Sequence, residues 1–129
     1  MKGFTIILFI LSLCIIPGCQ SEDLQTNYPF LKQSPVTILF SNDLEIEKEN
    51  SYYEALLDFK RIHPDQLASI NVVTTEDDAL INHFDVHTFP TLLLIDDSNV
   101  LLRIEGVKET YEIFDYIEAS LQVSTEESF

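Results

Sequence analysis

The sequence predicts an α/β fold in which helices flank a central mixed four-stranded sheet. Three observations lead to this prediction. Apolar runs of strand length alternate with segments of helical periodicity, a helix-length segment separates the first two runs, and only a short polar turn separates the last two. Because a helical crossover joins parallel strands and a tight turn joins antiparallel strands, the predicted sheet is mixed.

The first half of the predicted fold begins with a strand at residues 36–40, a β-branched and aromatic run. Asn42 and Asp43 follow it with side chains that cap helices. A helix is expected over residues 45–62, because His63-Pro64 stops helical geometry. Its apolar positions recur at roughly helical spacing: Ile46, Tyr53, Leu56, Leu57, Phe59 and Ile62.

The second half contains two further strands that form a hairpin. The expected elements are, in order, a strand at 67–73, a helix at 76–84, a strand at 90–95, a turn at 96–99, a strand at 100–104 and a helix after Gly106. The last helix is expected to bury one face, made of Tyr111, Phe114, Ile117 and Leu121. Residues 123–129 are expected to form a frayed tail.

The N-terminus has the pattern of a targeting segment. Lys2 precedes an uncharged apolar run from Phe4 to Ile16, which ends at Pro17-Gly18. This run is shorter than the roughly 20 residues that a spanning helix needs, so a cleaved signal peptide is predicted. An ordinary secreted protein that is cut nearby, leaving Cys19 as a free thiol, is the alternative.

The segment Ile16-Pro17-Gly18-Cys19 resembles the lipobox of bacterial lipoproteins. The resemblance implies that Cys19 carries diacylglycerol, with or without an added N-acyl chain, and becomes the mature N-terminus. Two acyl chains are enough for stable anchoring to a membrane. The predicted organisation is a signal peptide at 1–18, a lipidated tether at 19–34, a domain at 35–122 and a tail at 123–129.

The composition excludes several kinds of partner. The formal net charge is -15, so binding to nucleic acid is disfavoured by its sign. Clustered basic residues that would grip anionic lipid headgroups are also missing. Attachment to a membrane is therefore expected to come from the lipid on Cys19.

Residues 86–121 resemble the C-terminal half of a thioredoxin. Val86 precedes Phe89-Pro90-Thr91, and a hairpin, Gly106 and a final helix follow at the family's spacing. The resemblance extends more weakly to residue 35 and implies a thioredoxin-like fold with a cis peptide bond before Pro90. A trans proline at a strand start is the alternative.

The same resemblance places Glu45-Ile46-Glu47-Lys48 where thioredoxins carry Cys-x-x-Cys. Leu39 falls where many of them bury an aspartate, and Leu44 falls where they carry a tryptophan. Cys14 lies in the leader and Cys19 is the expected lipid attachment site, so the mature chain would contain no free thiol. The resemblance therefore implies a domain without dithiol oxidoreductase activity.

Glu45, Glu47 and Glu49 are candidates for cation binding or acid–base chemistry, because crowded carboxylates can split their pKa values. Acidic residues are equally expected at a helix start, where they interact with the helix dipole. Lys48 follows Glu45 by three residues and offers a surface ion pair. Both interpretations of the carboxylates remain open.

Histidines are common metal ligands, and this chain has three of them. His83 and His87 are four residues apart, and His63 lies elsewhere, but His87 is expected beyond the helix end, so no metal site is predicted. By the resemblance, His87 faces the helix start at Glu45, where it could titrate near neutral pH. The acidic segment 96–99 lacks the ligand spacing of a calcium loop and is predicted to be a turn.

Phe89 and Pro90 are the predicted binding residues, with His87 and Glu45 beside them. In thioredoxins the backbone before the cis-proline pairs with an extended peptide, and a domain without thiols could keep that groove. The alternative is that Pro90 only preserves the fold. No catalytic residue, metal or cofactor other than the covalent lipid is predicted.

The sequence thus predicts a non-enzymatic lipoprotein on the extracytoplasmic face of a membrane that binds an envelope protein or peptide. Two alternatives remain. One is a cell-wall-associated or assembly lipoprotein in which the acidic surface matters more than a groove. The other is an enzyme without thiol chemistry that uses Glu45, Glu47 and His87.

Overall fold

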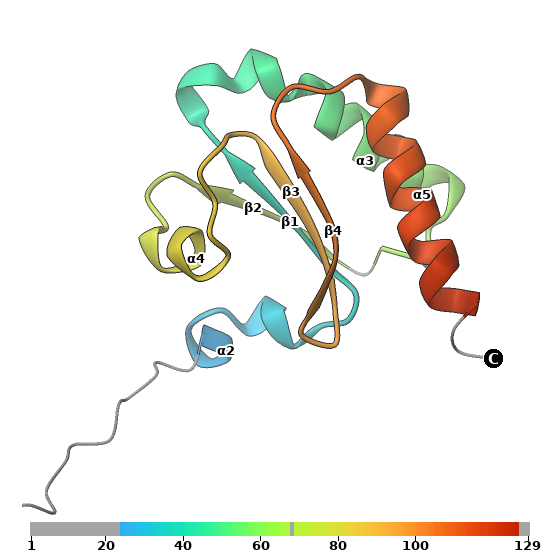
Figure 1. Cartoon of the computed structure of the whole chain (residues 1–129), viewed down its shortest axis with the longest axis horizontal. Helices are drawn as coiled ribbons and strands as arrows, with labels where there is room; N and C mark the ends of the chain where they lie inside the picture. Colours follow the sequence, from blue (N-terminus) through green and yellow to red (C-terminus); the bar gives the residue numbers. More distant parts are fainter. Residues whose placement is uncertain (1–23, 68, 127–129) are drawn as a thin grey trace, which may run out of the picture.

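The structure, a computed structural model, describes residues 24–67 and 69–126. It contains one four-stranded sheet in the order β2-β1-β3-β4 (Figure 1). The strands are β1 (Val36–Ser41), β2 (Ser69–Thr74), β3 (Thr91–Asp96) and β4 (Asn99–Glu105). Strands β1 and β2 are parallel and the other pairs are antiparallel, which confirms the predicted mixed sheet.

Two helices cover one face of the sheet. They are α3 (Asn50–Ile62) and α5 (Thr110–Glu126), and both contribute to a cluster that includes Leu39, Leu92 and Leu94 from the central strands. The intervening residues of β1 and β3 contribute to a second cluster, which includes Leu80 of α4 (Asp78–His83). Residues of β1 and β3 are therefore buried on both faces, which explains their continuous apolar runs.

The segment before β1 forms part of the fold, where only a tether was expected. Residues of α2 (Leu24–Asn27) and η2 (Pro29–Lys32) make two short helical turns. Tyr28, Phe30 and Leu31 pack against the second cluster. Burial removes their apolar surface from water, which lowers the free energy of the folded chain. Cys19 and the predicted signal peptide lie outside the described residues.

The helix expected from residue 45 begins later. A 3₁₀ segment, η3 (Asp43–Glu49), precedes α3, and Glu45 has non-helical backbone angles of φ -130 and ψ 36. Asn42 caps this segment as predicted, since its side chain accepts a hydrogen bond from the Leu44 N–H at 3.1 Å. Because η3 occupies residues 43–49, the α-helix begins at Asn50.

The predicted buried face of α5 is confirmed at Phe114, Ile117 and Leu121, which pack into the first cluster, but it is wrong at Tyr111. Ile113 is buried in its place, whereas Tyr111 is 65% exposed. Two residues in a helix correspond to about 200°, so Tyr111 lies almost opposite Ile113. The helix also continues to Glu126, through residues that were expected to belong to the tail.

The β3–β4 hairpin has the predicted turn. Asp96 pairs with Asn99, so the loop consists of Asp97 and Ser98, whose φ angles are 50 and 67. Two positive values identify a type I′ turn, whose twist matches that of the flanking strands. Within the described part of the chain, no helix is both long enough and apolar enough to cross a bilayer.

Candidate functional site

Three chain segments meet at one end of the sheet. The strand register places Phe40, Thr91 and Glu105 side by side on β1, β3 and β4. Three segments therefore lie at this end of the sheet: η3 follows β1, Phe89-Pro90 precedes β3, and Gly106-Val107 follows β4 (Figure 1). We call these three segments together the cis-proline end.

The peptide bond between Phe89 and Pro90 is cis, as the resemblance predicted, and the Ser34–Pro35 bond is cis as well. The Pro90 carbonyl accepts a hydrogen bond from the Gly106 N–H at 2.8 Å. The Thr91 hydroxyl donates to the Thr88 carbonyl at 2.5 Å. Pro90 is buried, while Phe89 is half-buried, so the loop is fixed on both sides of the proline.

Gly106 joins this loop to helix α3. Its φ of +80 is unfavourable for residues with a Cβ, so glycine suits the position. The buried Tyr52 donates from its hydroxyl to the Gly106 carbonyl at 2.5 Å. Burial, with a smaller contribution from the Glu105 carboxylate, raises the pKa of Tyr52 above its ordinary value, which keeps the phenol protonated as a donor.

A buried carboxylate holds the η3 segment to the end of β1. Glu49 is 1% exposed and accepts hydrogen bonds from the Ser41 hydroxyl at 2.6 Å and the Asn42 N–H at 2.7 Å. Its burial was not predicted, since Glu49 was grouped with Glu45 and Glu47 at a helix start. The signal that could have separated it is its spacing, because residues 49, 52, 56 and 59 share one helical face.

The other predicted site residues occupy separate surface pairs. Glu45 pairs with Lys48 at 3.1 Å, as expected, and Glu47 is exposed. His87 Nε2 lies 2.6 Å from Asp85 Oδ1, and both side chains are exposed. No hydrogen bond or ion pair between these two described segments joins Glu45 to His87.

The histidines lie apart from one another. His63 contacts Glu118 at 3.3 Å, and the ring of His83 lies 4.7 Å from that of Phe84. In residues 24–67 and 69–126, no three His, Cys, Asp or Glu side chains are grouped so that they could hold a metal ion.

Apolar side chains are exposed at the cis-proline end. Leu44 is 93% exposed, Ile46 is 52% exposed and Val107 is 65% exposed. The sequence predicts Leu44 only as a departure from the thioredoxin pattern and Ile46 as an apolar position of a helix. Both residues instead belong to the 3₁₀ segment η3 and extend away from the core. Exposed apolar side chains are a common feature of binding surfaces.

The chain has two cysteines, Cys14 and Cys19, so the described fold contains no thiol. The segment that the resemblance places at the thioredoxin Cys-x-x-Cys position contains Ile46 between Glu45 and Glu47, and all three side chains are exposed. The surface of η3 is therefore both apolar and acidic.

Comparison with solved structures establishes a thioredoxin-like fold. A thioredoxin f2 of Chlamydomonas reinhardtii matches with a TM-score of 0.59 and 18% identity, over 74% of this chain and 89% of that one. Thioredoxin 1 of Thermosipho africanus matches with a TM-score of 0.57 and 20% identity, over 70% of this chain and 98% of that one. At these identities, the likeness concerns the fold alone.

The chain is also similar in sequence to a bacterial lipoprotein. The chain is 32% identical over 77 residues to a "Pal-related lipoprotein" of Bacillus subtilis (strain 168). The matched region is 59% of this chain and 60% of that protein's length. No family model matches the chain.

Proposed function

We propose that the chain is an envelope lipoprotein, anchored through Cys19, whose thioredoxin-like domain binds a protein or extended peptide without thiol chemistry. The binding surface is the cis-proline end. The observation that carries the proposal is the exposure of Leu44, Ile46 and Val107 beside an ordered Phe89-Pro90 loop. These side chains offer apolar contact area where a partner backbone can lie along the residues before Pro90.

The proposed location rests on two further observations. The leader ends at a segment that resembles a lipobox, and the relative from Bacillus subtilis is named as a lipoprotein. A lipid on Cys19 would hold the domain on the extracytoplasmic face of a membrane, where a partner in the envelope is within reach.

The binding proposal is tested by photocrosslinking in the cells that produce the protein. In one variant a photoreactive residue replaces Leu44, whose side chain is almost fully exposed. In a control variant the same photoreactive residue replaces Tyr116 on α5. Mass spectrometry then identifies the captured proteins. We expect one dominant envelope protein from position 44 that is absent or strongly depleted from position 116. Equal capture from both positions would contradict a binding surface at the cis-proline end.

The anchor requires a separate test. Replacing Cys19 by serine removes the thiol that would receive diacylglycerol. The variant is therefore expected to leave the membrane fraction, and its measured mass should lack the added mass of the lipid. A matched Cys14→Ser chain, altered in the leader, should remain lipidated and membrane-bound. Membrane retention of the Cys19→Ser chain without lipid would contradict anchoring at this residue.

A further inference from the structure

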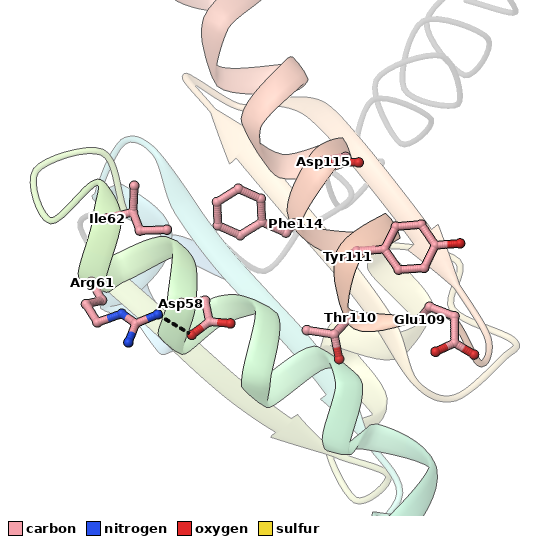
Figure 2. Close-up of a pocket in the computed structure, with 8 residues that line it drawn as sticks. All are labelled: Asp58, Arg61, Ile62, Glu109, Thr110, Tyr111, Phe114 and Asp115. Atoms are coloured by element: carbon pink, nitrogen blue, oxygen red, sulfur yellow. Dashed lines mark hydrogen bonds and ion pairs between the residues drawn. The ribbon is translucent and has the colours of Figure 1, made fainter.

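A second surface lies between the two large helices and shares no residue with the cis-proline end. A pocket of about 410 Å³ opens between the end of α3 and the start of α5 (Figure 2). The residues that line it are Asp58, Arg61, Ile62, Glu109, Thr110, Tyr111, Phe114 and Asp115. We call this pocket the α3–α5 groove.

The two helices run side by side in the same direction. The Thr110 hydroxyl donates to Glu54 at 3.0 Å, and the rings of Phe59 and Phe114 lie 5.4 Å apart. His63 contacts Glu118 further along. Successive residues along α3 therefore contact successive residues along α5, so the two helices are parallel. These contacts set the relative position of the two helices beside the groove.

The groove has an apolar base and apolar walls. Phe114 is half-buried and is backed by the fully buried Phe59. Ile62 is 56% exposed on α3, and Tyr111 is also largely exposed on α5 (Figure 2). An exposed tyrosine and an isoleucine beside a pocket offer apolar contact area with little cost in side-chain ordering.

The groove's charge is predominantly negative. Three carboxylates line it, whereas the one guanidinium, that of Arg61, lies 3.1 Å from Asp58 and is already paired (Figure 2). No ion pair within the described ranges neutralises Glu109 or Asp115. The whole chain adds to this field with a net charge of -15, which favours the approach of a cation.

We propose that the α3–α5 groove binds a cationic amphipathic segment of a partner protein. The apolar stem of a lysine or arginine would lie on Phe114 and Tyr111, and the charged group would interact with Glu109 and Asp115. Aromatic faces attract cations, and long basic side chains place their methylenes on apolar surface while the charge stays at the rim. This inference is independent of the binding function proposed for the cis-proline end.

The test uses the full chain in a neutral detergent and a fluorescent amphipathic lysine–leucine peptide as the probe. Fluorescence anisotropy measures its dissociation constant, and empty micelles provide the background. The combined Glu109→Gln and Asp115→Asn substitutions are expected to weaken binding about tenfold, since both rim charges are lost. The matched control, Glu76→Gln with Asp78→Asn, removes the same charge from exposed positions outside both proposed surfaces and is expected to change the constant less than about twofold.

A second pair of variants tests the aromatic contact without changing charge. Tyr111→Ser is expected to weaken the peptide about threefold, while Tyr111→Phe retains the ring and the affinity. Equal weakening by the groove pair and the control pair would overturn the proposal in favour of nonspecific charge attraction. Absence of binding, or equal binding of a glutamate–leucine peptide, would also overturn it.

Discussion

Glu49 illustrates how a single residue shapes the cis-proline end. Its carboxylate occupies the interior, where it satisfies the Ser41 hydroxyl and the Asn42 N–H together. Desolvation of the charge opposes this arrangement, and the two short hydrogen bonds offset the cost. As a result, η3 is held against β1 from inside while Leu44 and Ile46 extend outward.

Replacing Glu49 by alanine is expected to lower the free energy of unfolding by about 2–4 kcal/mol, because the buried Ser41 hydroxyl and the partly buried Asn42 N–H lose their acceptor. Glu49→Gln preserves the shape and one acceptor oxygen, so a smaller loss of about 1–2 kcal/mol is expected. Urea unfolding followed by circular dichroism measures both values. An alanine variant as stable as the parent would contradict the structural role given to Glu49.

Tyr52 predicts how stability depends on alkaline pH. Its pKa is raised in the folded chain above the ordinary value of 10.0, so folding favours the protonated phenol. The resulting stability is fully present below about pH 10 and falls as the pH rises through the folded value, because the unfolded chain loses its proton first. In urea unfolding above pH 10, Tyr52→Phe should therefore lose stability less steeply than the parent. Identical slopes for the two chains would contradict this linkage.

At the scale of elements, strand runs were the most predictable feature. Continuous apolar sequence at residues 36–40 and 91–95 indicated buried strands, and the polar turn between the last two strands fixed their antiparallel pairing. The cis bond before Pro90 followed from a resemblance rather than from periodicity. Each of these features depends on local sequence, which explains the agreement.

Helix boundaries and burial were less predictable, because tertiary contacts decide them. The 3₁₀ segment η3 occupies the expected helix start at Glu45, and its last residue, Glu49, accepts hydrogen bonds from the end of β1 and from the residue after it. Tyr52, absent from the predicted apolar face, is buried, and its hydroxyl donates to the Gly106 carbonyl. Helical spacing can place Glu49 and Tyr52 on one face, but it does not identify their hydrogen-bond partners, which the fold brings close.

The hairpin offers a prediction at this scale. Ser98 adopts a φ of 67 at the second position of the type I′ turn, where glycine is strongly preferred. Ser98→Gly should therefore stabilise the chain by roughly 0.5–1 kcal/mol in thermal or urea unfolding. Glycine removes the backbone strain of the positive φ, and this gain is expected to exceed the cost of the greater entropy of the unfolded chain. A matched Ser69→Gly substitution in β2, where no positive φ is present, is expected to destabilise it. Loss of stability from Ser98→Gly would contradict the turn geometry.

At the scale of the whole molecule, helices cover both faces of the sheet while its cis-proline end keeps exposed apolar side chains. The N-terminal segment contributes to this division by packing Tyr28, Phe30 and Leu31 against one face. Ser34 also joins the hairpin turn, since its hydroxyl bonds to Asp96 and accepts from the Asp97 N–H. The segment that follows the expected anchor is thus attached to the domain away from η3 (Figure 1).

The central claim is that a thiol-free thioredoxin-like domain binds its partner through the cis-proline end. The most direct measurement is quantitative mass spectrometry of proteins that co-purify with the full chain, compared with a Leu44→Ser and Ile46→Ser variant. A control with Val100→Ser and Leu101→Ser removes two exposed apolar side chains from β4 instead. The account predicts that the η3 variant loses its principal partner at least about tenfold, while the β4 control retains it. Retention of that partner by the η3 variant, or equal loss from both, would contradict the claim.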